Sequence, residues 1–512
     1  RGARTIWLVV EDEGSIERDW AAWVEPRFVG AGGQRAVTEV GWVSATTGWG
    51  SVHKDRNAGG GPLTVAGRGV KGIGTHATSV IEVKVPEGMT RLVGRAAHDD
   101  GGAQQPDGGK MKFSIHSQVP KLVAKSAPGK SGPVEPAAGP ETLAVPDGLE
   151  ATLFAGEPLL SSPSDIDVDA RGRVWVCEVT NYRGKRETRK EGDRILVLED
   201  TDGDGKADKQ TVFHQGRDVD SALGICVIGE GPGRKVIVSC APDVFVFHDD
   251  DGDLKADRKE SLFTKVGTPQ HDHSTHAFVV GPDGRLYFNV GNTGRAVHDK
   301  DGKAIKDRFG NEVNDSGKPF RQGMVFRCKP DGSDFEVLGH NFRNNYEVTV
   351  DSFGSLWQSD NDDDGNRGVR INWVMDYGNY GYVDERTGAG WSTPRTNLET
   401  EIPLRHWHQN DPGVVPNLLL TGGGSPTGIC VYEGTLLPER YHGALLHCDA
   451  GPNVVRSYHV TPARAGYAAT MEPLVDGSAD RWFRPSDVCV APDGSVIVAD
   501  WYDPGVGGHG MG

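Results

Sequence analysis

The chain has 512 residues, of which 36% are hydrophobic and 71 are glycine, and its formal net charge is −17. This length exceeds what one ordinary core needs, so we expect two domains. The acidic balance argues against nucleic acid as a partner, because no excess of cations is available to replace phosphate counterions. No apolar run is long enough for a transmembrane segment.

Short runs typical of strands fill residues 1–118, and the composition then changes. Residues 119–145 are rich in Pro, Ala, Gly, Lys and Ser, which is typical of a semi-extended linker. We therefore predict an all-β protein with domain boundaries at 1–118, 119–145 and 146–512.

The front domain carries a Gly-x-Gly pair in Gly72–Ala77 and an acidic pair at Asp99 and Asp100. Glycines allow close backbone approach, and the acidic pair offers oxygens to calcium or sugar hydroxyls, or braces turns. The region from about Thr5 to Ser117 resembles the NPCBM family of carbohydrate-binding modules, and the resemblance implies a jelly-roll-like β-sandwich that binds glycans.

After the linker, one hairpin pattern recurs six times at irregular spacing. An apolar strand leads through a Gly or Asp turn into a second, more hydrophobic strand. The six copies begin at Asp165, Gly224, Ala277, Glu347, Gly428 and Asp487. Repeated units of this kind stack radially, so we predict a six-bladed β-propeller. The alternative architecture, a large β-sandwich, does not require six copies of one hairpin.

Residues 501–512 leave no room for two more strands, so either the N-terminal part of the propeller completes the last blade or the chain is truncated.

None of the seven cysteines forms a CxxC or CxxCH motif, which excludes an encoded zinc ribbon or covalently attached haem. Most lie in strand-like runs and are interpreted as small buried hydrophobes. Two pairs, Cys226–Cys240 and Cys430–Cys448, are spaced to bridge neighbouring strands.

A histidine cluster, His271-Asp272-His273-Ser274-Thr275-His276, comes directly before an innermost strand, at the rim of the expected channel. Imidazoles there suit a general base or a metal site, with His271, His273 and His276 as the alternative ligand set. The alternative is that these histidines are hydrogen-bonded to neighbouring loops.

A second polar segment, residues 339–345, precedes the next innermost strand. Its Arg343 is a forked donor for carboxylate or quinone oxygens, or a brace for its own loop.

Two acidic loops place carboxylates at alternate positions around glycines, the spacing of a calcium loop. The ligand candidates are Asp200, Asp202, Asp204 and Asp208 in the first loop, and Asp249, Asp251, Asp253 and Asp257 in the second. A third acidic run, residues 360–366, is a weaker case. Solvated Asp/Gly turns are the alternative interpretation.

From about Pro146 onward the chain resembles the propeller of PQQ-dependent soluble glucose and aldose-sugar dehydrogenases. The motifs are HSTHAFVVGPDGRLYF from His273, GHNFRNNYEVTV from Gly339, DYGNYGYVD from Asp376 and FRPSDVCVAPDGSV from Phe483. The resemblance implies His273 as catalytic base with Asp272 beside it, and PQQ and calcium as cofactors. It also implies quinone contacts from Arg343, Asn344 and Arg484, and a periplasmic or extracellular protein.

The sequence also departs from that family. Asp449 stands where the family has a quinone-binding lysine, and Tyr346 where it has glutamine. Further histidines are expected around the same mouth: His276, His340, His406, His408 and His447. These changes weaken the case for a quinone and favour a divalent transition metal.

The leading hypothesis is a sugar-oxidising, quinone-dependent enzyme that a glycan-binding module holds near a polysaccharide and that passes electrons to a separate acceptor such as a cytochrome. The alternatives are a metal-dependent glycan hydrolase or lyase on the same propeller, and a non-catalytic glycan-binding protein.

Overall fold

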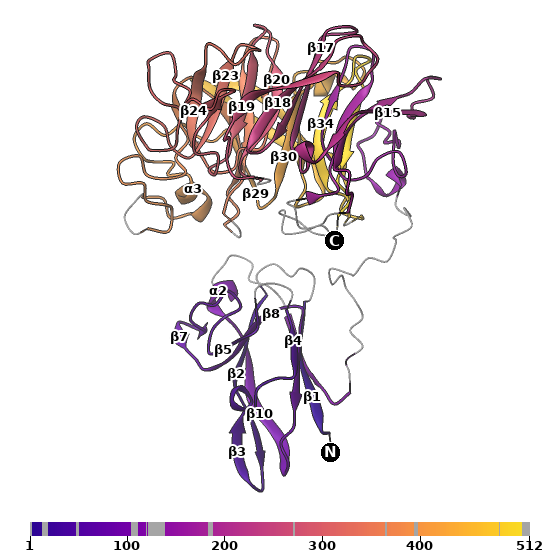
Figure 1. Cartoon of the computed structure of the whole chain (residues 1–512). Coiled ribbons are helices and arrows are strands. Elements are labelled where there is room, and N and C mark those ends of the chain that lie inside the picture. Colours follow the sequence, from indigo (N-terminus) through magenta and orange to yellow (C-terminus); the bar gives the residue numbers. More distant parts are fainter. Residues whose placement is uncertain are drawn as a thin grey trace. The chain divides into compact units, whose positions relative to one another are not determined.

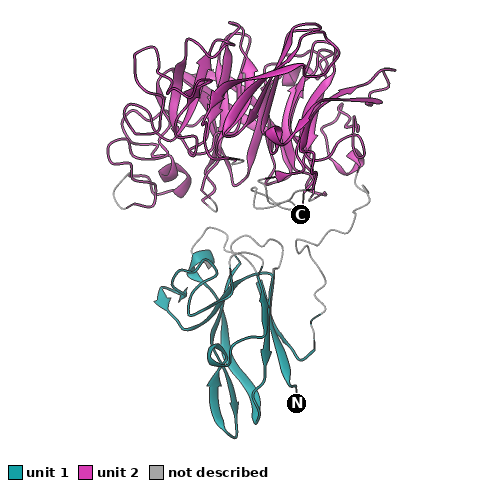
Figure 2. Cartoon of the chain, viewed as in Figure 1, with its two compact units in different colours: residues 1–129 teal, residues 130–512 magenta. Residues whose placement is uncertain are grey.

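The chain divides into two compact units, residues 1–129 and 130–512 (Figure 2). The structure is a computed structural model that describes residues 3–12, 19–47, 51–103, 111–118, 120, 139–182, 188–269, 272–363, 366–393, 398–480 and 482–503. Within those residues, no helix has the length and apolar character needed to cross a membrane.

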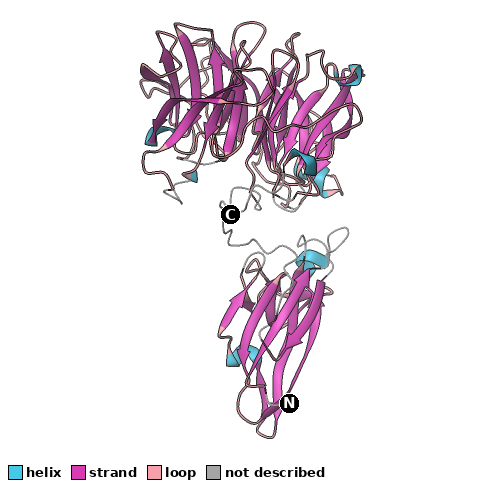
Figure 3. Cartoon of the chain, turned by 90° about the vertical axis from the view of Figure 1, so that its right-hand side faces the viewer, coloured by secondary structure: helices cyan, strands magenta, loops and turns pink. Residues whose placement is uncertain are grey.

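The front unit is a sandwich of two antiparallel sheets (Figure 3). One sheet has the order β11-β1-β9-β4 and the other the order β10-β2-β8-β5, with β3 paired to β2. The strands are β1 (Thr5–Asp12), β2 (Trp20–Gly30), β3 (Gly33–Ala36), β4 (Ser44–Thr46), β5 (His53–Lys54), β8 (Gly72–His76), β9 (Ser79–Lys84), β10 (Met89–His98) and β11 (Met111–His116). A hairpin of β6 (Thr64–Val65) and β7 (Arg68–Gly69) and the short helices α1 (Val37–Val40) and α2 (Asp100–Ala103) complete the unit.

Alternating apolar residues build the core between these sheets. Leu8 and Val10 from β1 pack with Trp23 from β2 and Ile73 from β8. The Gly-x-Gly pair permits close strand approach, as predicted: a Cβ on Gly72 would lie 2.0 Å from the Trp23 carbonyl oxygen.

The second unit contains six sheets, and each of the predicted repeats supplies the first two strands of one sheet. Figure 1 labels several of these strands, coloured along the sequence. Blade 1 is β12 (Pro163–Val168), β13 (Val174–Glu178), β14 (Asp193–Glu199) and β15 (Lys209–Gly216); blade 2 is β16 (Gly224–Ile228), β17 (Arg234–Cys240), β18 (Asp243–Asp249), β19 (Arg258–Thr264) and β22 (His298–Asp299). Blade 3 is β20 (Thr275–Val280), β21 (Leu286–Val290), β23 (Gly323–Cys328), β24 (Glu336–Phe342) and β28 (Gly378–Asn379); blade 4 is β25 (Val348–Val350), β26 (Leu356–Asp360), β27 (Val369–Val374) and β29 (Leu419–Gly422). Blade 5 is β30 (Pro426–Val431), β31 (Leu445–Asp449), β32 (Val454–Ala463) and β33 (Gly466–Asp476); blade 6 is β34 (Pro485–Val490) and β35 (Val496–Asp500). The helix α3 (Ile402–His406) lies in the insertion between β28 and β29.

The innermost strands form a closed ring, because each contacts the next and β34 contacts β12. The closing contact includes hydrogen bonds from the Ile166 amide to Asp487 Oδ2 (2.8 Å) and from Ser486 Oγ to the Pro163 carbonyl (2.7 Å). An apolar cluster fills each of the six interfaces between neighbouring blades. Second strands such as β13, β21 and β31 are buried along their whole length, which explains their unbroken apolar runs. The six-bladed prediction is confirmed.

Blade 6 has two strands among the described residues, and the segment before β12 adds no strand to it. Ala144 instead forms a bridge with Asp476 at the outer strand of blade 5. Leu143 and Leu149 pack against the cluster between blades 5 and 6. The expectation that this segment supplies strands to the last blade is therefore wrong for the described residues.

The seven cysteines are all free. Cys226 lies opposite Ile237, not Cys240, and Cys430 lies opposite Leu446, not Cys448. Register therefore rules out the two suggested bridges, and the interpretation of the cysteines as small packed side chains holds.

Candidate functional site

The polar segments predicted to carry chemistry lie at the starts of innermost strands. His273 precedes β20, Arg343 and Asn344 precede β25, and Arg484 precedes β34. Because every blade repeats the same hairpin, these starts lie on one face of the ring, here called the rim.

His273 is oriented by a side chain from the end of β21. Its Nδ1 lies 2.6 Å from Asn292 Oδ1, and its carbonyl oxygen accepts a hydrogen bond from Thr293 Oγ1 at 2.8 Å. In the tautomer with the proton on Nδ1, that nitrogen donates to Asn292 and Nε2 is the basic nitrogen. This arrangement suits a general base.

Asn344 comes close to His273 across a glycine. A Cβ on Gly291 would lie 2.7 Å from Asn344 Oδ1 and 2.7 Å from the His273 carbonyl oxygen. The Asn292 amide also donates to the Arg343 carbonyl at 2.7 Å, so blades 3 and 4 are joined here. Asn344 is buried and its Oδ1 has no hydrogen-bond partner within the described residues.

Arg343 is held by Asp363. Arg343 Nε donates to Asp363 Oδ1 at 2.8 Å, while its Nη1 is buried without a partner among the described residues. Asp363 also accepts from Trp391 Nε1 at 3.0 Å, lies 3.1 Å from His406 Nε2 and accepts from Tyr382 OH at 3.3 Å. Burial opposes ionisation, yet the His406 hydrogen bond and the Arg343 charge hold the pKa of Asp363 well below its usual range.

Arg484 is buried at the start of β34 and donates through Nη1 to the carbonyl oxygens of Ala450 (3.3 Å) and Phe483 (3.2 Å). Its amide donates to Asp500 Oδ1 at 2.8 Å. Its predicted role toward a cofactor stays a prediction.

The side chain of Asp449 binds groups within its own blade. It is fully buried, forms an ion pair with Arg456 and accepts a hydrogen bond from the Ser425 amide at 2.8 Å. Its charge is therefore compensated within blade 5 and does not make the rim more acidic.

Most of the additional histidines serve packing. His276 is buried, stacks on Tyr346 with ring centroids 4.2 Å apart, and lies with Nε2 2.8 Å from the Asp272 carbonyl oxygen. His340 lies on the outer strand β24, His447 contacts Tyr458 OH at 3.1 Å, and His408 Nδ1 lies 2.7 Å from the Gly381 carbonyl oxygen.

These positions bear on the predicted metal ligands. His271 lies outside the described residues, and the described part of the chain places only carboxylates in groups tight enough to hold a metal. His273 and His276 belong to no such group among the described residues. Their role as metal ligands and the role of Asp272 beside His273 both stay predictions.

Sequence reasoning missed three contributors to the rim: Asn292, Trp391 and Tyr382. Asn292 follows directly after a predicted strand, a position that could have identified it. Trp391 and Tyr382 come from the long insertion between β27 and β29, and no local pattern predicts where an insertion folds back.

The two acidic loops connect the third and fourth strands of blades 1 and 2. Three carboxylates of each loop bring oxygens within 4.8 Å of one another: Asp200, Asp202 and Asp204, and Asp249, Asp251 and Asp257. Asp208 instead accepts a hydrogen bond from Thr201 Oγ1 (2.7 Å), and Asp253 from the Lys255 amide (2.9 Å). Calcium binding stays a prediction. Strand alternation puts both loops on the face opposite the rim, so their role would be structural.

In the third acidic run, residues 360–366, Asp364 and Gly365 lie outside the described residues, and the other three carboxylates bind protein groups. Asp360 pairs with buried Arg370 at 2.8 Å, Asp362 accepts from the Gly368 amide, and Asp363 binds Arg343. The three side chains are thus directed to three separate partners.

In the front unit, the acidic pair braces turns. Asp99 accepts hydrogen bonds from the Thr64 and Gly101 amides, both at 2.9 Å, and Asp100 accepts one from the Gly67 amide at 2.9 Å. His76 is buried with Nδ1 2.8 Å from the Ala77 carbonyl oxygen. These contacts favour the structural interpretation of that motif.

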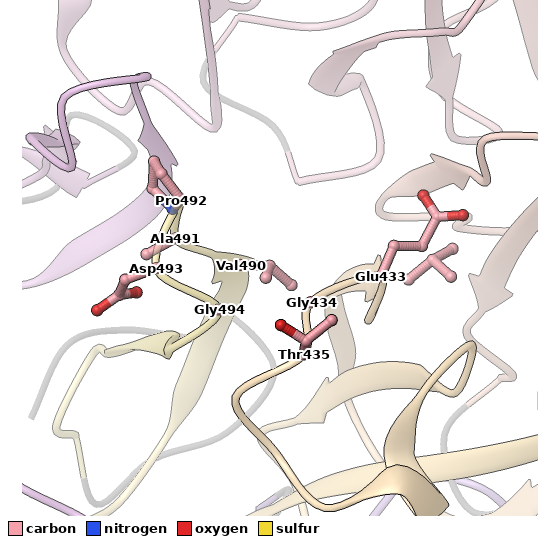
Figure 4. Close-up of a pocket in the computed structure, with 9 residues that line it drawn as sticks. Glu433, Gly434, Thr435, Val490, Ala491, Pro492, Asp493 and Gly494 are labelled. Atoms are coloured by element: carbon pink, nitrogen blue, oxygen red, sulfur yellow. The ribbon is translucent and has the colours of Figure 1, made fainter.

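A hollow of about 460 Å³ lies between the turns that follow β30 and β34, away from the rim (Figure 4). Its two acidic groups are engaged: Glu433 accepts from Ser352 Oγ at 2.6 Å and Asp493 from Ser495 Oγ at 2.7 Å. The hollow therefore presents no unengaged carboxylate.

Fold and site together define a six-bladed β-propeller with a polar rim, joined to a separate β-sandwich. Residues 135–506, more than half of the chain, match the family model described as "Domain of unknown function (DUF7133)", and the protein belongs to this family. Residues 33–136 match the NPCBM/NEW2 domain, which confirms that prediction for the front unit.

Among curated proteins no sequence matches the chain. Three similar solved structures are the PQQ domain of pyranose dehydrogenase from Coprinopsis cinerea (17% identity, 70% of this chain and 94% of that chain, TM-score 0.48), PQQ-bound aldose sugar dehydrogenase from Streptomyces coelicolor (15%, 72% and 94%, 0.44) and virginiamycin B lyase from Staphylococcus aureus (12%, 67% and 94%, 0.34). At such identities and TM-scores, no residue role carries over to this chain.

The rim has groups that fit a polycarboxylate quinone. Arg343 Nη1 is a buried cationic donor and Asn344 Oδ1 a buried acceptor, each without a partner in the described residues. A buried polar group without a partner is costly, so both favour a polar ligand beside them.

Proposed function

We propose that the propeller is a quinone-dependent dehydrogenase that oxidises a sugar hydroxyl at the rim between blades 3 and 4. The observation that carries the proposal is that Asn292 binds the His273 ring through its side chain and the Arg343 carbonyl through its amide, so both residues lie on the same part of the rim. Removal of a hydroxyl proton beside an electron-accepting cofactor needs a base and a cationic binding group on the same part of the rim.

In this proposal His273 Nε2 takes the hydroxyl proton, while the hydrogen bond between Nδ1 and Asn292 fixes the ring. Arg343 and Asn344 hold the quinone, and Asp363 orients the Arg343 guanidinium. When bound, PQQ supplies the two-electron acceptor for the hydride from the sugar carbon. A separate redox protein would take up the electrons. Calcium, the second cofactor that we propose, would bind in the two acidic loops.

The front unit would bind glycan and raise the local concentration of substrate through tethering alone. Because its ligand would be a polysaccharide, we place the activity in the periplasm or outside the cell. The match to the NPCBM/NEW2 domain supports the glycan partner.

The test is reduction of an artificial electron acceptor by a panel of sugars, with the protein reconstituted with PQQ and calcium. Replacing His273 with alanine should lower turnover by about 10²–10⁴-fold, the usual contribution of a general base. His442→Gln, an exposed histidine in the turn after β30, should leave turnover unchanged. Absence of dye reduction with every sugar, in wild type and His273→Ala alike, would refute the proposal.

A further inference from the structure

The centre of the propeller contains a cluster of carboxylates that the proposed function does not use. Asp165, Glu347 and Asp487 are each buried, and their oxygens lie within 4.8 Å of one another. They come from blades 1, 4 and 6 and are far apart in the sequence. The cluster is therefore formed by the tertiary structure and not by a single acidic loop.

The cluster occupies one ring of equivalent positions. These three residues and Gly224, Ala277 and Gly428 are the first residues of the six repeats. Three blades thus contribute a carboxylate at this level, and the other three contribute no side chain larger than a methyl group. Space is tight where the glycines stand: a Cβ on Gly224 would lie 2.4 Å from the His276 carbonyl oxygen.

One oxygen of each carboxylate holds a neighbouring blade. Asp165 Oδ1 accepts from the Ile225 amide (2.9 Å), Glu347 Oε2 from the Ile429 amide (2.6 Å) and Asp487 Oδ2 from the Ile166 amide (2.8 Å). Asp487 Oδ1 also accepts from the Val488 amide at 2.7 Å. Asp165 Oδ2 is buried, in a residue only 1% exposed, and has no hydrogen-bond partner among the residues that the structure describes.

The charged groups that act most strongly on the cluster are all carboxylates, and Glu347 and Asp487 are hydrogen-bonded to each other. Burial, followed by repulsion from Asp487, raises the pKa values of Asp165 and Glu347 well above their usual range, and Asp167 adds to the repulsion on Asp165. Buried carboxylates this close together require either protons or a cation between them.

We propose that Asp165, Glu347 and Asp487 bind one calcium ion in the central channel and so link blades 1, 4 and 6. Carboxylate oxygens are ligands for hard cations, and a calcium–oxygen distance of about 2.4 Å lets one ion contact oxygens up to roughly 4.8 Å apart. Magnesium needs shorter distances and near-ideal octahedral geometry, so it fits this spacing less well. The ion would stabilise the ring and takes no part in the reaction at the rim.

The test separates this site from the two acidic loops. Asp202→Asn together with Asp251→Asn, both exposed, gives a background chain with both loops weakened. After removal of metal with a chelator, titration of this chain with Ca²⁺ should show one bound ion and a rise in melting temperature, and Mg²⁺ should give a smaller rise. Absence of calcium binding by this background chain would overturn the proposal and leave shared protons as the explanation.

Asp165→Asn in the same background distinguishes a ligand from a structural residue. Its Oδ1 can still accept from Ile225, so the contact with blade 2 is kept. Because the substitution removes one negative charge, the variant should melt at the same or a higher temperature than its parent in chelator, and at a lower temperature in calcium. An equal loss of stability in both solutions would refute the proposal. Glu347→Gln is the second variant and should show the same reversal.

Discussion

At the scale of single residues, the most informative side chain is Asp363, which orients Arg343 and contacts three further polar side chains from an insertion. A guanidinium held through Nε presents Nη1 in a fixed direction, so less of its flexibility is lost when a ligand binds. We therefore expect Arg343 to keep the orientation proposed for cofactor binding only while Asp363 is charged.

Asp363→Asn should weaken PQQ binding by about tenfold, because it removes the charge that positions Arg343. Titration of the purified chain with PQQ, followed by absorbance or fluorescence, measures the effect. Asp376→Asn, an exposed residue of the same insertion, is the control and should bind as the wild type does. Equal affinities for all three proteins would show that Asp363 does not position the binding group.

The buried histidines predict a pH effect on stability. Burial lowers the pKa of His447 to about 3, whereas an unfolded histidine titrates near 6.5. Between these values the unfolded chain binds the proton and the folded chain does not, so stability is lost as pH falls below about 6.5.

Replacing His447 with asparagine removes this penalty. From pH 7 to pH 5, the free energy of unfolding of His447→Asn should shift by up to about 2 kcal/mol in favour of the variant, relative to wild type. Urea unfolding at both pH values measures the change. The buried carboxylates titrate in both proteins, so the difference in unfolding free energy between the two proteins reports on the histidine alone. A difference that does not change with pH would contradict the prediction.

At the scale of elements, the innermost strands are packed so closely that side-chain size matters at single positions. Gly224→Ala should destabilise the propeller by about 2–4 kcal/mol, because its Cβ would lie 2.4 Å from a backbone atom of the next blade. Gly390→Ala, with nothing within 4 Å of a Cβ, should cost little. Thermal or denaturant unfolding measures the stability of both variants. Equal stabilities of the two variants would be evidence against close packing of this ring.

The acidic loop of blade 1 connects β14 and β15 and is a candidate calcium site. If it binds calcium, Asp202→Asn should remove one ion per chain and lower the melting temperature in calcium by a few degrees, with no change in chelator. Lys206→Gln in the same loop is the control and should keep the ion. A calcium stoichiometry that Asp202→Asn leaves unchanged would identify the loop as a solvated turn.

At the scale of the whole molecule, the two units have separate cores. A chain of residues 139–512 should therefore unfold within a few degrees of the propeller transition in the full chain and keep its dye reduction on small sugars. Its binding to insoluble polysaccharide should fall at least tenfold. Calorimetry and a pull-down assay test the two statements; loss of folding by the isolated propeller would contradict the first.

How much the sequence predicts depends on how local the cause is. The six hairpins are local: alternation and turn residues specify each blade, and ring closure then follows from the need to cover both faces of every sheet. His273 and Arg343 were located for the same reason, because each directly precedes an innermost strand. Asp449 was misjudged, since its partner Arg456 sits on the neighbouring strand and nothing in the local pattern shows that pairing.

By itself, then, the sequence determined the all-β class, the two domains and the face of the ring on which the polar segments lie. Only the tertiary structure decided which histidines pack in the blades, that Asp363 holds Arg343, and that Asp165, Glu347 and Asp487 meet in the channel. The physical reason is that strand pattern is a property of neighbours in the chain, whereas charge compensation and burial depend on residues that closure of the ring brings together.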